Sequence, residues 1–72
     1  MAMMSGGQAA VAAIEVEEVK TVFGLIGSAT MEMFDALYDS ESINFVGVHD
    51  ERTGTHMADG YARVSGEAGV IL

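Results

Sequence analysis

Three short apolar segments alternate with three stretches of helical periodicity, and this alternation is the strongest constraint on what the chain can fold into. The expected strands are residues 21–23, 43–48 and 70–72, which are rich in β-branched and other apolar side chains. Strands joined by single helices run parallel, with right-handed crossovers and helices on both faces of the sheet. The sequence therefore predicts a three-layer α/β fold that begins with a helix.

The middle helix has the clearest periodicity of the three. It should run to about Tyr38 after a cap at Ser28 or Thr30. Its apolar residues recur at spacings of three and four, which places them on one helical face. We expect four residues to form this apolar stripe: Met31, Phe34, Leu37 and Tyr38.

The other two helices are recognised mainly by their ends. The first should begin after a cap at Ser5 and run to about Glu18. Acidic residues gather at its carboxyl end and oppose the helix macrodipole, so we expect that end to fray. The third helix should begin between Arg52 and Thr55 and end near Val64.

The charge balance excludes several classes of partner. Eleven acidic residues face three basic ones, for a formal net charge of -8. A surface that binds nucleic acid or anionic lipid needs the opposite sign. The sequence has no apolar run of about 18 residues, as a membrane-spanning helix needs. Residues 1–13 lack the basic segment of a signal peptide, so we expect a cytoplasmic protein.

The length of 72 residues suits one small domain at most. Its last residues form an apolar strand, and an unpaired strand promotes aggregation. We therefore expect residues 1–72 to be part of a domain that is truncated after its third strand. The alternative is a small protein whose final strand is held in the sheet.

Two turns that lead from a strand into a helix are the candidate sites, because ligands gather at the carboxyl ends of parallel strands. The first, residues 24–28, carries Gly24 and Gly27. Two glycines at this spacing make neither a dinucleotide fingerprint nor a phosphate loop. They indicate either a tight turn that needs glycine dihedral angles or a loop that faces a ligand.

The second turn, residues 49–56, is denser in titratable groups. Its acids can simply cap and solvate the start of a helix. His49, Asp50, Glu51 and His56 could instead hold a metal, but their spacing matches no familiar zinc pattern. Arg52 can pair with the neighbouring acids or bind a substrate.

Two segments together resemble a known family. Residues 22–27 read VFGLIG and are followed by DALY at residues 35–38; Glu51 is followed by HMADGYAR at residues 56–63. These segments are similar to the start of the acetolactate synthase and sulfoacetaldehyde acetyltransferase group of thiamine-diphosphate-dependent enzymes. The resemblance extends over nearly the whole chain from about Gly6.

The resemblance implies a pyrimidine-binding domain with parallel strands in the order 2-1-3. It implies that Glu51 hydrogen-bonds the N1′ nitrogen of the cofactor aminopyrimidine and so activates thiamine diphosphate toward 2-keto acids or related carbonyl substrates. Gly24, Ile26 and Gly27 would lie against the cofactor.

The same resemblance implies partners that these residues do not supply. In such enzymes the diphosphate and its Mg²⁺ are held by a separate domain of the same or a neighbouring subunit, so we expect a homo-oligomer and an inactive isolated fragment. No metal-binding residue is assigned within residues 1–72. A different class remains open, in which the chain is a non-catalytic oligomerising or interaction module that retains the fold.

Five positions depart from the family pattern. Proline is common where Ile26 stands, and glycine commonly ends the first helix where Glu18 stands. Arginine and histidine are common at His49 and Asp50, and a small or amide residue is common at Arg52. These departures leave the substrate class open.

Overall fold

The structure, a computed structural model, describes residues 3–72. Within this range the elements alternate as expected between helices and strands. In chain order they are α1 (Gly6–Val16), β1 (Thr21–Gly24), a 3-10 turn η1 (Ser28–Thr30), α2 (Met31–Tyr38), β2 (Asn44–Gly47), α3 (Glu51–Ser65) and β3 (Val70–Ile71).

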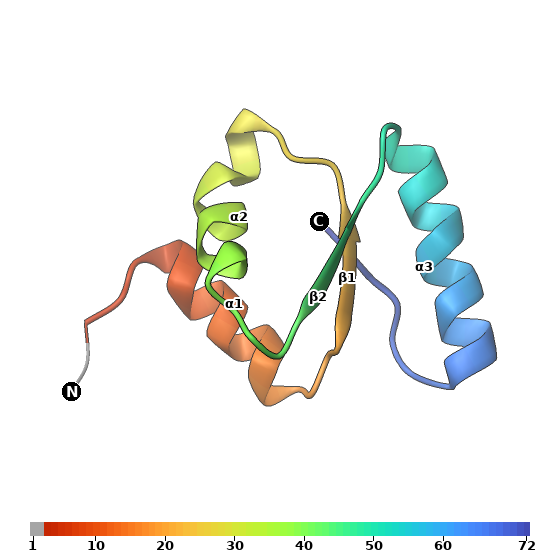
Figure 1. Cartoon of the computed structure of the whole chain (residues 1–72), viewed down its shortest axis with the longest axis horizontal. Helices are drawn as coiled ribbons and strands as arrows, with labels where there is room; N and C mark the ends of the chain where they lie inside the picture. The colour runs from red at the N-terminus through yellow and green to blue at the C-terminus, as the bar shows by residue number, and fades with distance from the viewer. Residues whose placement is uncertain (1–2) are drawn as a thin grey trace.

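The described strands form one parallel sheet in the order β2-β1-β3. Helices α1 and α2 cover one face of the sheet and α3 covers the other (Figure 1). The three-layer arrangement, the parallel strands and the strand order predicted from the sequence are thus confirmed. No helix within residues 3–72 has both the length and the apolar character needed to cross a membrane.

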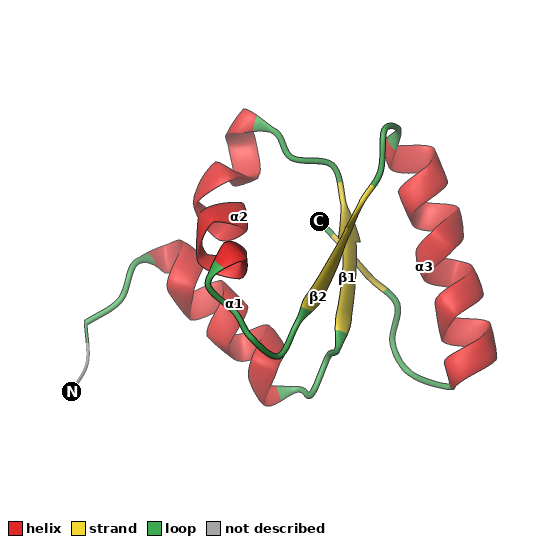
Figure 2. Cartoon of the chain, viewed as in Figure 1, coloured by secondary structure: helices red, strands yellow, loops and turns green. Residues whose placement is uncertain are grey.

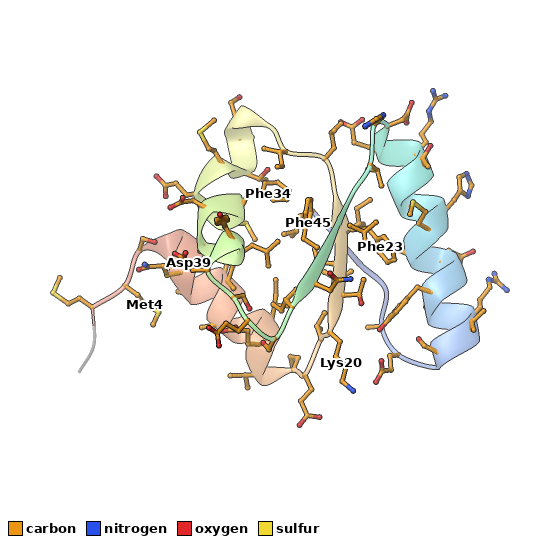
Figure 3. All side chains as sticks on the ribbon, viewed as in Figure 1. Met4, Lys20, Phe23, Phe34, Asp39 and Phe45 are labelled. Atoms are coloured by element: carbon orange, nitrogen blue, oxygen red, sulfur yellow. The ribbon has the colours of Figure 1, made fainter. Side chains whose placement is uncertain are left out.

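The main core lies between β1 and the pair of helices α1 and α2. Val22 of β1 is fully buried at its centre, and the other buried members of the cluster are Val11, Phe34, Leu37 and Ile43. The Phe34 and Phe45 rings meet edge to face, with centroids 5.2 Å apart (Figure 3). Such aromatic contacts add to the free energy gained by burying apolar area.

Helix α3 approaches the opposite face of the sheet through small residues. Gly54 and Ala58 are buried there. The Tyr61 ring lies edge-on to Phe23 of β1, with centroids 5.9 Å apart. Tyr61 is therefore a packing residue.

The carboxyl end of α1 differs from the expectation. The helix starts as predicted, with Ser5 and Gln8 forming a reciprocal capping box, but it ends at Val16 and not near Glu18. Glu18 adopts a left-handed conformation with φ of 61°. The Glu18 N–H donates to the Glu15 carbonyl and the Val19 N–H donates to the Ile14 carbonyl. This is the helix-ending turn in which glycine is favoured.

Helix α2 also departs from the sequence prediction at two points. Neither Ser28 nor Thr30 caps the helix through its side chain, because the 3-10 turn η1 leads directly into it. Of the predicted apolar stripe, only Phe34 and Leu37 are buried, whereas Met31 is 58% and Tyr38 82% exposed. The helix has eight residues, and Tyr38 lines an open groove together with Ile43 and Phe45.

Candidate functional site

The loops that follow β1 and β2 lie at the same edge of the sheet. Gly24 ends β1, Gly47 ends β2, and the two are register partners. The Val48 N–H donates to the Gly24 carbonyl at 2.9 Å, which extends the pairing by one residue. Figure 2 shows both loops leaving the sheet at one end. The topology therefore brings the two candidate turns together at the edge where ligands of parallel sheets bind.

Glu51 is the first residue of α3 and lies at this edge. The sequence predicts that this helix begins at or after Arg52, but the side chain of Asp50 caps the helix and brings Glu51 into its first turn. The Glu51 side chain is exposed. Within residues 3–72 no hydrogen bond or ion pair occupies its carboxylate, while its backbone carbonyl accepts from the Thr55 hydroxyl at 2.9 Å. The carboxylate is thus free to meet a ligand.

Asp50 caps the start of α3 and forms an ion pair with Arg52 in its first turn. Asp50 Oδ1 accepts from the Arg52 backbone N–H at 2.8 Å, and Asp50 Oδ2 accepts from Arg52 Nη2 at 3.1 Å. The side-chain hydrogen bond from Arg52 lowers the pKa of Asp50, with a further lowering from the backbone N–H bond. The hydrogen bond to the Asp50 side chain raises the pKa of Arg52. Arg52 therefore pairs with a neighbouring acid, one of the two roles that the sequence left open.

Gly24 is required for packing and not for its dihedral angles. Among the described glycines only Gly66 has a positive φ, so the tight-turn interpretation of residues 24–28 is wrong. A Cβ on Gly24 would lie 2.9 Å from the Leu72 carbonyl oxygen and 3.2 Å from the rings of Phe34 and Phe45. Gly24 is buried. The absence of a side chain there lets the backbone of the first loop pass close to the packed interior.

Ile26 and Gly27 form the outer part of the first loop. The Leu25 N–H donates to the Leu72 carbonyl at 3.4 Å, which ties the loop to the last described residue. Nothing in the sequence signalled this contact. Ile26 is 62% exposed. Gly27 is extended, and a Cβ there would have no atom within 4 Å. The loop thus presents an apolar side chain and open space beside Gly27.

The structure does not gather His49, Asp50, Glu51 and His56, the candidate metal ligands of the second turn, into a metal site. Within residues 3–72, no group of three or more His, Asp or Glu side chains is placed to hold a metal ion. His49 and His56 are both exposed. The second turn therefore offers a single free carboxylate, that of Glu51, beside a charge pair.

In open parallel α/β sheets, ligands bind outside the carboxyl ends of the strands, and the exposed carboxylate of Glu51 lies at that end of this sheet. The family model described as "Thiamine pyrophosphate enzyme, N-terminal TPP binding domain" matches residues 4–72. The chain belongs to this family, as the segments around Gly24 and Glu51 indicated.

Several acetolactate synthases are among the curated proteins that this chain resembles. The chain is 48% identical over 69 residues to the probable acetolactate synthase large subunit of Methanocaldococcus jannaschii, which covers 96% of this chain and 12% of the relative. It is 43% identical over 72 residues to the acetolactate synthase isozyme 3 large subunit of Escherichia coli, covering 100% of this chain and 12% of that protein. The mitochondrial acetolactate synthase catalytic subunit of Saccharomyces cerevisiae is 42% identical over 69 residues, or 96% of this chain and 10% of that protein. The chain thus spans only a small part of the length of these relatives.

Proposed function

We propose that this chain is the pyrimidine-binding part of an acetolactate synthase-like enzyme and that Glu51 is the residue that activates the cofactor. The observation that carries the proposal is the free carboxylate of Glu51 at the carboxyl edge of a sheet whose family binds thiamine pyrophosphate. The relatives that carry the name acetolactate synthase support the choice of reaction class.

The residues at this edge fit an aminopyrimidine ring. The Glu51 carboxylate has no partner within residues 3–72, and a ring nitrogen can supply one. Ile26 offers an exposed apolar side chain for a ring face, and the space beside Gly27 is open. When bound, thiamine diphosphate supplies the carbon–carbon chemistry on a 2-keto acid or related carbonyl substrate.

Glu51 acts in this proposal by holding and sharing a proton. A carboxylate can accept a hydrogen bond from the protonated N1′ nitrogen of the pyrimidine and can take up that proton, whereas a glutamine amide can only hydrogen-bond. Asp50 and Arg52 act as positioning residues, because they fix the first turn of α3 from which Glu51 projects.

The diphosphate and its Mg²⁺ are assigned to another part of the protein. Within residues 3–72 no cluster of acids is placed to bind a cation. The chain corresponds to about 12% of the length of two of its relatives. We infer that a diphosphate-binding domain, from the same or a neighbouring subunit of a homo-oligomer, completes the site. Residues 1–72 alone are then inactive.

A chimeric enzyme tests the role of Glu51. Residues 4–72 replace the matching segment of the Methanocaldococcus jannaschii relative, and acetolactate formation from pyruvate is measured with and without Glu51→Gln. We expect kcat to fall by about 100-fold or more, as for the loss of a residue that moves a proton. Cofactor-dependent quenching of protein fluorescence reports binding separately from turnover.

Glu41→Gln in the same chimera is the matched control, because Glu41 is an exposed acid in the turn before β2. It should leave kcat and cofactor binding unchanged. Equal activity of the Glu51→Gln and Glu41→Gln chimeras would contradict the proposal.

A further inference from the structure

We propose that the free edge of β2, with the apolar groove beside it, binds an extended peptide in which apolar residues alternate with basic ones. The peptide would add a strand next to β2 and place its apolar side chains in the groove. This interaction surface is separate from the role of Glu51 and does not depend on it.

The backbone of β2 offers unpaired groups along this edge. The Asn44 N–H donates to the Lys20 carbonyl at 2.7 Å and the Val48 N–H donates to the Gly24 carbonyl at 2.9 Å, so even-numbered residues of the strand face β1. Backbone groups alternate in direction along a strand, so those of Phe45 and Gly47 point away from β1. Because β2 ends the strand order, no described strand pairs with them.

An apolar groove runs along the same edge on the side covered by α2. It has a volume of about 290 Å³, and its apolar lining residues are Ile26, Phe34, Leu37, Tyr38, Ile43 and Phe45. Tyr38 is 82% exposed at its rim. A strand added to β2 would direct every second side chain toward this groove. Backbone hydrogen bonds and pockets for alternate side chains are the two components of peptide binding by strand addition.

The charges of the chain indicate a basic occupant. At 100° per residue, Asp35 lies next to Tyr38 and Met31 on the outer side of α2, and it is exposed. No cation lines the groove: Arg52 pairs with the residue that caps α3, Arg63 pairs with an acid of α3, and Lys20 precedes β1 at the opposite end of the sheet. The chain has a net charge of -8, so it would repel a second copy of itself and attract a peptide rich in lysine.

Titration of the 72-residue chain with a fluorescein-labelled octapeptide of alternating valine and lysine tests the proposal. We expect saturable binding by fluorescence anisotropy, with shifts of the Phe45 and Gly47 amide signals in NMR spectra. Tyr38→Ser should weaken binding about tenfold, because an apolar contact of this size is lost. Tyr38→Phe should bind as the unchanged chain does.

Val64→Ser is the matched control, because Val64 is 91% exposed on α3, on the other face of the sheet. It should not alter binding. A peptide with alternate backbone nitrogens methylated cannot pair with β2 and should lose binding. The proposal is wrong if the methylated peptide or an octalysine binds equally well, if Tyr38→Ser has no effect, or if no binding occurs. Self-association through β2 that excludes the peptide would identify a second copy as the occupant and overturn it as well.

Discussion

Gly24 and Gly47 stand opposite each other as the last residues of β1 and β2. Because the two strands are parallel, this pairing makes the loops that follow β1 and β2 leave the sheet at the same end. The loop that holds Ile26 and the turn that holds Glu51 are therefore neighbours, although 25 positions separate them in the sequence. The proposed cofactor site depends on this register.

Gly24→Ala should destabilise the fold, whereas Gly27→Ala should not. The added methyl group at residue 24 would lie 2.9 Å from the Leu72 carbonyl oxygen, so we expect a loss of about 2 kcal/mol in the free energy of unfolding. The methyl group at residue 27 meets no atom within 4 Å on an extended backbone. Urea denaturation followed by circular dichroism checks both. Equal stabilities would show that the interior beside Gly24 is not tightly packed.

Gly69 and Gly60 should respond in opposite directions to alanine. A Cβ on Gly69 would overlap the Ala58 carbonyl oxygen, so α3 would have to move away from the sheet at a cost of about 3 kcal/mol. Gly60 lies inside α3 with open space around it, and alanine there should stabilise the helix by about 1 kcal/mol. Thermal denaturation measures both changes. A stabilising Gly69→Ala would contradict the close contact of residues 58 and 69.

Glu18→Gly should stabilise the chain. Glu18 holds a left-handed conformation with φ of 61°, which costs a non-glycine residue about 1 kcal/mol. Glu17→Gly removes the same charge from a residue with φ of -78°, so it serves as the control and should not stabilise the fold. Comparison of the two midpoints in urea separates the dihedral effect from the loss of a negative charge. An equal gain in stability from both variants would mean that the loss of a negative charge, and not the dihedral angle of Glu18, is the cause.

The Asp50–Arg52 pair should make stability sensitive to acid. The pKa of Asp50 is lowered in the folded state by its hydrogen bonds with Arg52. Its contribution is therefore present above the unfolded pKa of about 3.9 and is lost as the pH falls through the folded value. Asp50→Asn keeps a capping side chain but not the charge, so the difference in stability between the two chains should shrink from pH 7 to pH 3.

Asp35→Asn is the control for this pH dependence, because Asp35 is exposed on α2 and takes part in neither ion pair. Comparison with it separates the loss of the Asp50–Arg52 ion pair from the loss of one negative charge. Urea titrations at the two pH values measure both differences. A constant difference for Asp50→Asn would mean that the ion pair adds nothing to the folded state.

Local patterns were sufficient for the order and type of the elements and for the turn that carries Glu51. Helical and strand periodicities are properties of neighbouring residues, so Phe34 and Leu37 could be assigned to a buried face without knowledge of their partners. Helix boundaries were less well predicted. Helix α3 begins at Glu51, one residue before the expected range, because Asp50 caps it, and Glu18 ends α1 through a left-handed turn that glycine usually forms.

By itself, the sequence determined the parallel α/β architecture, the family and the presence of a carboxylate at a strand-to-helix turn, because each depends on residues close together in the chain. Only the tertiary structure decided that Gly24 is needed to fit against Leu72 and that Tyr38 stays exposed beside the edge of β2. Burial and pairing depend on which distant segments meet, and that information is not contained in the period of any single element.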